Sequence, residues 1–176
     1  NAAVKADITY TFSYEKTGQI LWPGNEYTGK LVTIPIGITD DSFVETKPHM
    51  FSIEEKDLKN LPKRPDHSNK GTYGHLLVIA GSYNMAGAAV LSAKAAYRCG
   101  CGLVKVLTPQ ENRIIIQNQV PEALIGTYDD IEGALKWADA VVLGPGIGKQ
   151  PQAVDIVHKV LEKCDVPLLI DADGLN

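Results

Sequence analysis

Four short segments hold the residues whose types and spacing could bind a ligand. Each is expected next to a buried strand of a parallel sheet, and ligands bind such sheets beyond the carboxyl ends of the strands. The segments are GSYNMAGAA (81–89), VPEAL (120–124), GPGIG (144–148) and DADGLN (171–176). The sequence therefore predicts a binding site at one edge of the sheet.

The first segment joins a strand to a helix through small residues. Gly81 ends the predicted strand, and Gly87 and Ala88 stand at the start of the helix. The segment lacks both the G-x-G-x-x-G fingerprint of dinucleotide-binding folds and the G-K-[ST] ending of a P-loop. Small residues allow a ligand to approach the backbone, and they equally allow tight packing of the helix on the sheet. Both interpretations remain open for this segment.

The segment GPGIG has three glycines among five residues, at 144, 146 and 148. Exposed backbone N–H groups near the start of a helix form a site for anions. An ordinary strand-to-helix loop is the alternative. We favour a ligand site because glycine costs backbone entropy that packing alone seldom requires.

Charged residues add weaker indications. Asp171 and Asp173 follow a predicted strand, where carboxylates can hold Mg²⁺ or ribose hydroxyls, although Asp173 could simply cap a helix. Glu122 could begin a helix, whose dipole favours an acidic residue there. Lys70 could meet a phosphate, or it could be a solvated lysine.

The elements that position these residues alternate between strand and helix. Such alternation implies right-handed crossovers and a parallel sheet, and strands that are apolar throughout imply helices on both faces. We therefore predict a three-layer α/β/α domain with about four strands. The predicted strands are 75–81, 102–108, 140–144 and 167–171, and the predicted helices are 86–99, 109–117, 131–137 and 151–163.

The first part of the chain has a different pattern. Residues 8–16 and 30–38 are predicted strands, and Pro35 favours an edge position for the second. A polar, proline-containing stretch follows, and a structureless loop of that length is unusual inside one domain. We predict a domain boundary there.

Composition narrows the possible functions. The chain has 176 residues and a net charge of −4, so no basic surface is expected to attract nucleic acid. No apolar run approaches the ~20 residues needed to span a bilayer. Three cysteines, an odd number without the spacing of a zinc site, suit a reducing compartment such as the cytoplasm.

The motifs taken in order resemble a known family. NKGTYGHLLVIAGSYNMAGAA, PEAL, ADAVVLGPGIG and PLLIDADGLN resemble the ADP/ATP-dependent NAD(P)H-hydrate dehydratases, which have a ribokinase-like fold. The segment ADITYTFSYEKTGQILWPGNEYTGK resembles the last part of an NAD(P)H-hydrate epimerase domain. In bifunctional members the epimerase domain precedes the dehydratase. Asn69 departs from the family, which usually has histidine at this position.

The resemblance implies a metabolite-repair lyase whose substrate is hydrated NADH or NADPH. ATP or ADP, with Mg²⁺, would phosphorylate the added hydroxyl, and the phosphate would then leave. Gly87, Ala88, Gly146 and Gly148 would bind the hydrated dinucleotide, with possible support from Lys70, Asp171 and Asp173. The family's catalytic aspartate lies in a later Gly-[ST]-Gly-Asp loop.

The resemblance also implies an organisation for the chain. Residues 1–40 would be the C-terminal tail of an epimerase-like domain, 41–70 a linker, and 71–176 the N-terminal half of a dehydratase domain. We expect an internal fragment of a cytoplasmic, homo-oligomeric protein, with most of its nucleotide site outside this chain. Such a fragment would be inactive alone.

Two other functions remain open. A ribokinase-like small-molecule kinase shares the fold but does not explain the epimerase-like residues 8–38. A non-catalytic dinucleotide-binding module would need only the glycine loops.

Overall fold

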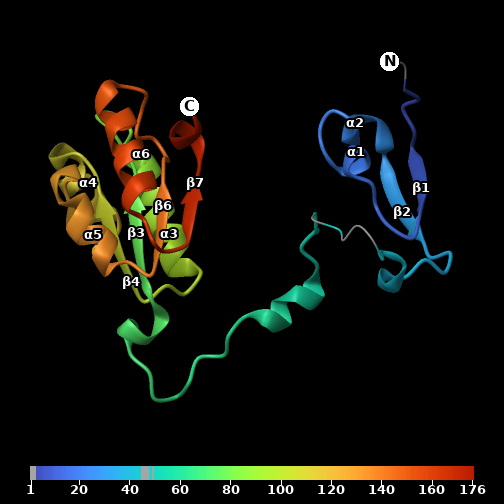
Figure 1. Cartoon of the computed structure of the whole chain (residues 1–176), viewed down its shortest axis with the longest axis horizontal. Helices are drawn as coiled ribbons and strands as arrows, with labels where there is room; N and C mark the ends of the chain where they lie inside the picture. The colour runs from blue at the N-terminus through green and yellow to red at the C-terminus, as the bar shows by residue number, and fades with distance from the viewer. Residues whose placement is uncertain (1–2, 45–47, 49) are drawn as a thin grey trace. The chain divides into compact units, whose positions relative to one another are not determined.

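The chain forms two compact units, 1–62 and 63–176, in a computed structural model that describes residues 3–44, 48 and 50–176 (Figure 1). The boundary between them falls inside the stretch predicted as a linker. Each unit is described by itself. In the described part of the chain, no helix combines the length and the apolar character needed to cross a bilayer.

The first unit contains a two-stranded parallel sheet. Strand β1 (Ile8–Phe12) pairs with β2 (Lys30–Ile34). In the chain, two single-turn helices connect these strands, α1 (Thr17–Ile20) and α2 (Asn25–Thr28). Both strands are shorter than predicted, and Pro35 comes directly after β2 rather than within it. The two short helices were not predicted, because the Pro-Gly pair at 23–24 indicates a turn.

The two faces of strand β1 differ in character. Thr11 of β1 is buried, and the hydroxyl of Thr9 donates to the carbonyl of Thr28 in α2 at 2.7 Å. The alternate residues Ile8, Tyr10 and Phe12 are 49%, 59% and 55% exposed. These three apolar side chains of β1 are thus uncovered.

The second unit is a five-stranded, fully parallel sheet in the order β5-β4-β3-β6-β7. Its helices cover both faces, as the sequence predicts (Figure 1). The strands are β3 (His75–Ile79), β4 (Leu103–Leu107), β5 (Leu124–Gly126), β6 (Ala140–Leu143) and β7 (Leu168–Ile170). The helices are α3 (Ala86–Arg98), α4 (Arg113–Gln119), α5 (Ile131–Trp137) and α6 (Pro151–Lys163).

Alternation along β3 builds the two cores. Leu77 and Ile79 face the cluster that includes α5 and α6, whereas Val78 and Ala80 face the cluster that includes α3 and α4. All four side chains are fully buried. Burial on both faces explains why the strand is a continuous apolar run in the sequence.

The prediction differs from the structure around residues 109–126. Helix α4 begins at Arg113, because residues 110–112 form a short 3-10 turn. The predicted helix start at Glu122 is wrong, since β5 begins two residues later and adds a fifth strand. Three residues are too few to show a periodic pattern, so β5 has no clear signal in the sequence.

Candidate functional site

The order of the strands places a topological switch point between β3 and β6. From β3 the chain moves outward through β4 to β5, and it then crosses back to place β6 on the other side of β3. In doubly wound sheets, ligands bind beyond the carboxyl ends of the two strands where the order reverses. The loops that border this switch point are 80–85, which holds the first part of GSYNMAGAA, and 144–150, which holds all of GPGIG.

The two loops contact each other directly. The backbone N–H of Gly81 donates to the carbonyl of Pro145 at 2.8 Å. A Cβ atom on Gly146 would lie 2.7 Å from the Cβ of Ala88 and 3.4 Å from that of Met85. The start of α3 therefore packs closely against the GPGIG loop, on one edge of the sheet.

Gly87 and Ala88 stand at the first turn of α3. No side chain caps this helix, so its N-terminal dipole is free to act on a ligand. Gly87 is exposed, and a Cβ added there would meet no atom within 4 Å. The structure thus leaves open space above Gly87, whereas Ala88 is half-buried against the second loop.

The glycines of the second loop have separate causes. A Cβ on Gly144 would lie 2.0 Å from the carbonyl oxygen of Asp171, so close packing excludes any side chain there. Gly148 has a φ of +78° and nothing nearer than 3.8 Å to an added Cβ. All three glycines have a positive φ, and close packing is a second reason for glycine at 144 and 146 but not at 148.

The aspartates after β7 lie beside the same loop. A carboxylate oxygen of Asp173 accepts from the backbone N–H of Gly148 at 3.0 Å. One N–H group that the sequence suggested for an anion is thus occupied by this chain's own carboxylate. Asp171 is exposed, and its backbone N–H donates to the carbonyl of Leu143 at 3.0 Å.

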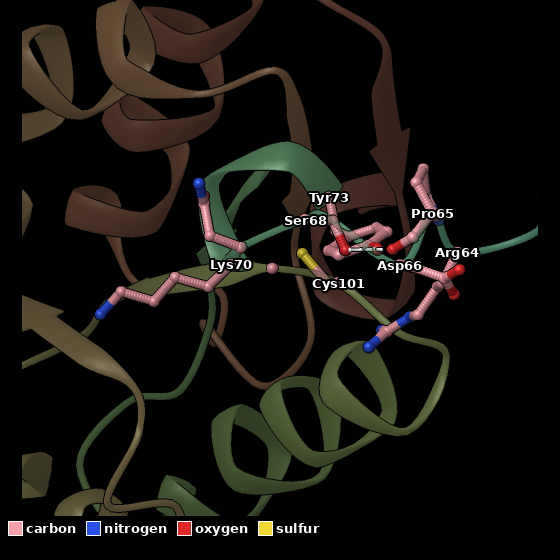
Figure 2. A pocket seen from close by; sticks show the side chains of 9 residues that line it. Arg64, Pro65, Asp66, Ser68, Lys70, Tyr73 and Cys101 are labelled. Carbon is pink, nitrogen blue, oxygen red and sulfur yellow. Dashed lines mark hydrogen bonds between the residues drawn. The ribbon is translucent and has the colours of Figure 1, made fainter.

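Lys70 lies away from these residues. It begins a 3-10 turn (Lys70–Tyr73) that precedes β3, and a Cβ on Gly102, just before β4, would lie 1.7 Å from its carbonyl oxygen. These contacts put Lys70 at the amino ends of the strands. It lines a hollow of about 500 Å³ there together with Arg64, Ser68, Tyr73 and Cys101 (Figure 2). Lys70 therefore does not join the glycine loops.

Two polar side chains behind the first loop, one half-buried and one buried, had no signal in the sequence. Tyr128, after β5, donates its hydroxyl to the carbonyl of Gly81. Asn112 is 3% exposed and donates to the carbonyl of Ser82 at 3.1 Å and to the hydroxyl of Thr108 at 3.0 Å. Their positions depend on β5 and on the 3-10 turn, neither of which was predicted.

Residues 76–176 match the family described as Carb_kinase, NAD(P)H-hydrate dehydratase. The chain belongs to this family. The resemblance found in the motifs is thereby confirmed.

Curated relatives match almost the whole chain. The bifunctional NAD(P)H-hydrate repair enzymes Nnr of Coxiella burnetii and Escherichia coli are each 39% identical to it over 99% of its length. The chain spans only 36% and 34% of those two proteins.

Solved structures have the same fold. A ribokinase-like superfamily protein from Enterococcus faecalis has a TM-score of 0.67 at 25% identity, over 74% of this chain and 49% of that one. The ADP/ATP-dependent NAD(P)H-hydrate dehydratase of Bacillus subtilis, co-crystallised with ATP/Mg²⁺, has a TM-score of 0.57 at 34% identity, over 65% of this chain and 43% of its own. The predicted ribokinase-like α/β/α fold is confirmed.

Proposed function

We propose that this chain supplies the substrate side of an NAD(P)H-hydrate dehydratase site. The parent protein would convert hydrated NADH or NADPH back to the intact cofactor, using ADP or ATP. The observation that carries the proposal is the meeting of the α3 start with the GPGIG loop at the switch point of the sheet, in a chain of this family.

The residues at the meeting point suit a flat, anionic dinucleotide. Gly87 leaves room for close approach, and Ala88 and Gly146 form a surface without side-chain bulk. The uncapped start of α3 favours a negatively charged group nearby. Gly148, whose N–H is held by Asp173, forms the outer edge of the same surface.

The nucleotide would supply a better leaving group. Transfer of its terminal phosphoryl group to the added hydroxyl makes a phosphate ester. Cleavage of the C–O bond then releases phosphate as the ring nitrogen donates its electrons, and loss of a proton from the adjacent ring carbon restores the double bond. Positioning of the two substrates accounts for much of the catalysis in such transfers. This chain would contribute by holding the hydrated ring in place.

Mg²⁺ and the nucleotide would be bound mostly by residues outside this chain. Within the described residues, no group of three or more His, Cys, Asp or Glu side chains gathers into a metal site. Asp171 is exposed near the loop, and Asp173 is already engaged with Gly148. We therefore assign a supporting role to both carboxylates.

The first unit supports a linked epimerase. We assign residues 1–40 to the C-terminal tail of an epimerase-like domain, 41–70 to a linker and 71–176 to the N-terminal half of the dehydratase domain. The bifunctional relatives match both units, since they align with 99% of the chain. A two-stranded sheet with an exposed apolar face also needs further structure for its stability, which the rest of such a domain would provide.

Two exposed apolar side chains and the cysteines bear on the assembly and the location of the protein. Leu91 of α3 and Ile114 of α4 are 71% and 72% exposed, and contact with a second copy would cover them. We propose a homo-oligomer in the cytoplasm, where the odd number of cysteines would stay reduced. Light scattering of the parent protein measures its oligomeric state directly.

The function is tested with the full-length protein that contains this chain. Hydrated NADPH is incubated with ATP or ADP, and the formation of NADPH is followed by its absorbance. A phosphorylated product that accumulates without NADPH would favour a small-molecule kinase. Binding of hydrated NADPH without either product would favour a non-catalytic module.

A matched pair of variants links the activity to the site. Ala88→Leu adds bulk at the meeting point, and Ala95→Leu adds the same bulk to an exposed position further along α3. We expect Ala88→Leu to raise KM for the hydrate at least ~10-fold, about 1.4 kcal/mol, and Ala95→Leu to leave KM unchanged. Equal values for the two variants would contradict the assignment of the site.

A further inference from the structure

We propose that Tyr128 and Asn112 are positioning residues for the substrate site. They hold two successive carbonyl groups of the β3–α3 turn toward the interior, and this orients two successive N–H groups toward the ligand. The ligand in this inference is the hydrated dinucleotide of the proposed function. The orientation of the turn can be tested without this ligand.

Tyr128 fixes the first carbonyl. Its hydroxyl donates to the carbonyl oxygen of Gly81 and lies 3.4 Å from that of Ala80. Burial raises the pKa of Tyr128, so the phenol keeps its proton and remains a donor at neutral pH. The side chain reaches the turn from the segment that follows β5.

Asn112 fixes the second carbonyl. Its side-chain amide has two N–H donors, and these account for both of its contacts, with the carbonyl of Ser82 at 3.1 Å and the hydroxyl of Thr108 at 3.0 Å. Thr108 is fully buried, and Asn112 is 3% exposed. A buried amide in this arrangement has little freedom to turn away from Ser82.

The planarity of the peptide bond transmits this constraint to the ligand side. In a trans peptide the C=O and N–H groups point in opposite directions. Holding the carbonyls of Gly81 and Ser82 inward therefore directs the N–H groups of Ser82 and Tyr83 outward. Among the described residues, no protein acceptor receives a hydrogen bond from either of these N–H groups.

The same turn is tied to the second glycine loop. The N–H of Gly81 donates to Pro145, and the N–H of Met85 donates to the carbonyl of Ser82 at 2.9 Å. These two bonds use the peptide groups on either side of the Gly81–Ser82 peptide, so a change in the conformation of the turn would strain both. By holding the carbonyls of Gly81 and Ser82, Tyr128 and Asn112 stabilise the turn that connects the start of α3 to the GPGIG loop.

A matched control variant distinguishes a role of Tyr128 in positioning the turn from a role in stability alone. Tyr97, near the other end of α3, is also half-buried, and its hydroxyl donates to the carbonyl of Glu122 at 2.8 Å. Tyr128→Phe and Tyr97→Phe each remove one phenol hydroxyl that donates to a backbone carbonyl. Each also removes one longer contact of 3.4 Å, with the carbonyl of Ala80 for Tyr128 and with the N–H of Val104 for Tyr97. Only the first loss affects the turn beside the site.

The test compares the two variants in the full-length protein. We expect Tyr128→Phe to raise KM for hydrated NADPH by ~5–10-fold, the effect of weakening about one hydrogen bond, with kcat and KM for ATP unchanged. Such a split is the signature of lost substrate binding rather than lost stability. Tyr97→Phe should change KM for the hydrate less than ~2-fold. The two variants should lower the thermal midpoint of unfolding by similar amounts.

Hydrogen exchange provides a readout that does not depend on activity. The protected amides of Gly81 and Met85 should exchange faster in Tyr128→Phe and at the wild-type rate in Tyr97→Phe. Equal exchange at these amides in both variants, or an equal KM for the hydrate, would overturn the inference. Failure of the unaltered protein to convert the hydrate would instead contradict the proposed function, and the exchange result would still decide the role of Tyr128.

Discussion

At Gly144 and Gly146 of the loop from β6 to α6, other atoms already occupy the space of a side chain, whereas Gly87 at the start of α3 faces open space. A Cβ on Gly144 would lie 2.0 Å from the backbone of the β7 loop, and one on Gly146 would lie 2.7 Å from Ala88. A Cβ on Gly87 would meet nothing within 4 Å. The two loops border the same switch point of the sheet, so the difference is not one of location.

This difference separates packing from ligand binding. A glycine within a helix costs roughly 0.5–1 kcal/mol relative to alanine, and at Gly87 no contact within the described chain requires that cost. Gly144 and Gly146 have sufficient structural reasons. The number of glycines in GPGIG is thus weaker support for a ligand than the single open glycine at 87.

The largest effect is expected from Gly144→Ala. Its methyl group would collide with the carbonyl oxygen of Asp171 and with the backbone nitrogen of Gly174, 2.8 Å away, and neither is the end of a flexible side chain. We expect the free energy of unfolding to fall by about 3 kcal/mol or more. Urea denaturation followed by circular dichroism measures the change. A loss below ~1 kcal/mol, in the range of ordinary surface substitutions, would mean that the β6 and β7 loops are not in contact.

An intermediate effect is expected from Gly148→Ala. The space for a methyl group is present, but the φ of +78° is unfavourable for any residue with a Cβ. We expect a loss of about 1–2 kcal/mol in the free energy of unfolding. Gly148→Asn is the control, because asparagine tolerates this backbone region better and should lose less. Equal losses for alanine and asparagine would contradict a conformational cause.

Much of the fold could be predicted from the sequence because the strands of the second unit are apolar throughout. Burial on both faces gives β3 an unbroken run from Leu76 to Ala80, and alanine-rich or amphipathic stretches mark α3 and α6. Strand β5 could not be predicted. It has three residues, and its position depends on pairing with β4, which lies about 20 residues earlier in the chain.

The candidate site was predictable only in part. Strand ends followed by glycine identify the two loops, because carboxyl ends of parallel strands share an edge. The contact between Ala88 and Gly146 depends on the strand order, which the sequence does not specify. Lys70 was considered because of its charge, but it precedes β3 and therefore belongs to the other end of that strand.

The smallest effect on stability, with a separate effect on binding, is expected from Gly87→Ala. Its methyl group would enter open space, and alanine favours the helix, so the free energy of unfolding should rise by at most ~1 kcal/mol. If a dinucleotide lies against this turn, the same methyl group should raise KM for the hydrate several-fold. The measurement pairs urea denaturation with kinetics in the full-length protein. Unchanged KM together with raised stability would leave Gly87 without a role in binding, and the open glycine would then be an ordinary feature of the helix start.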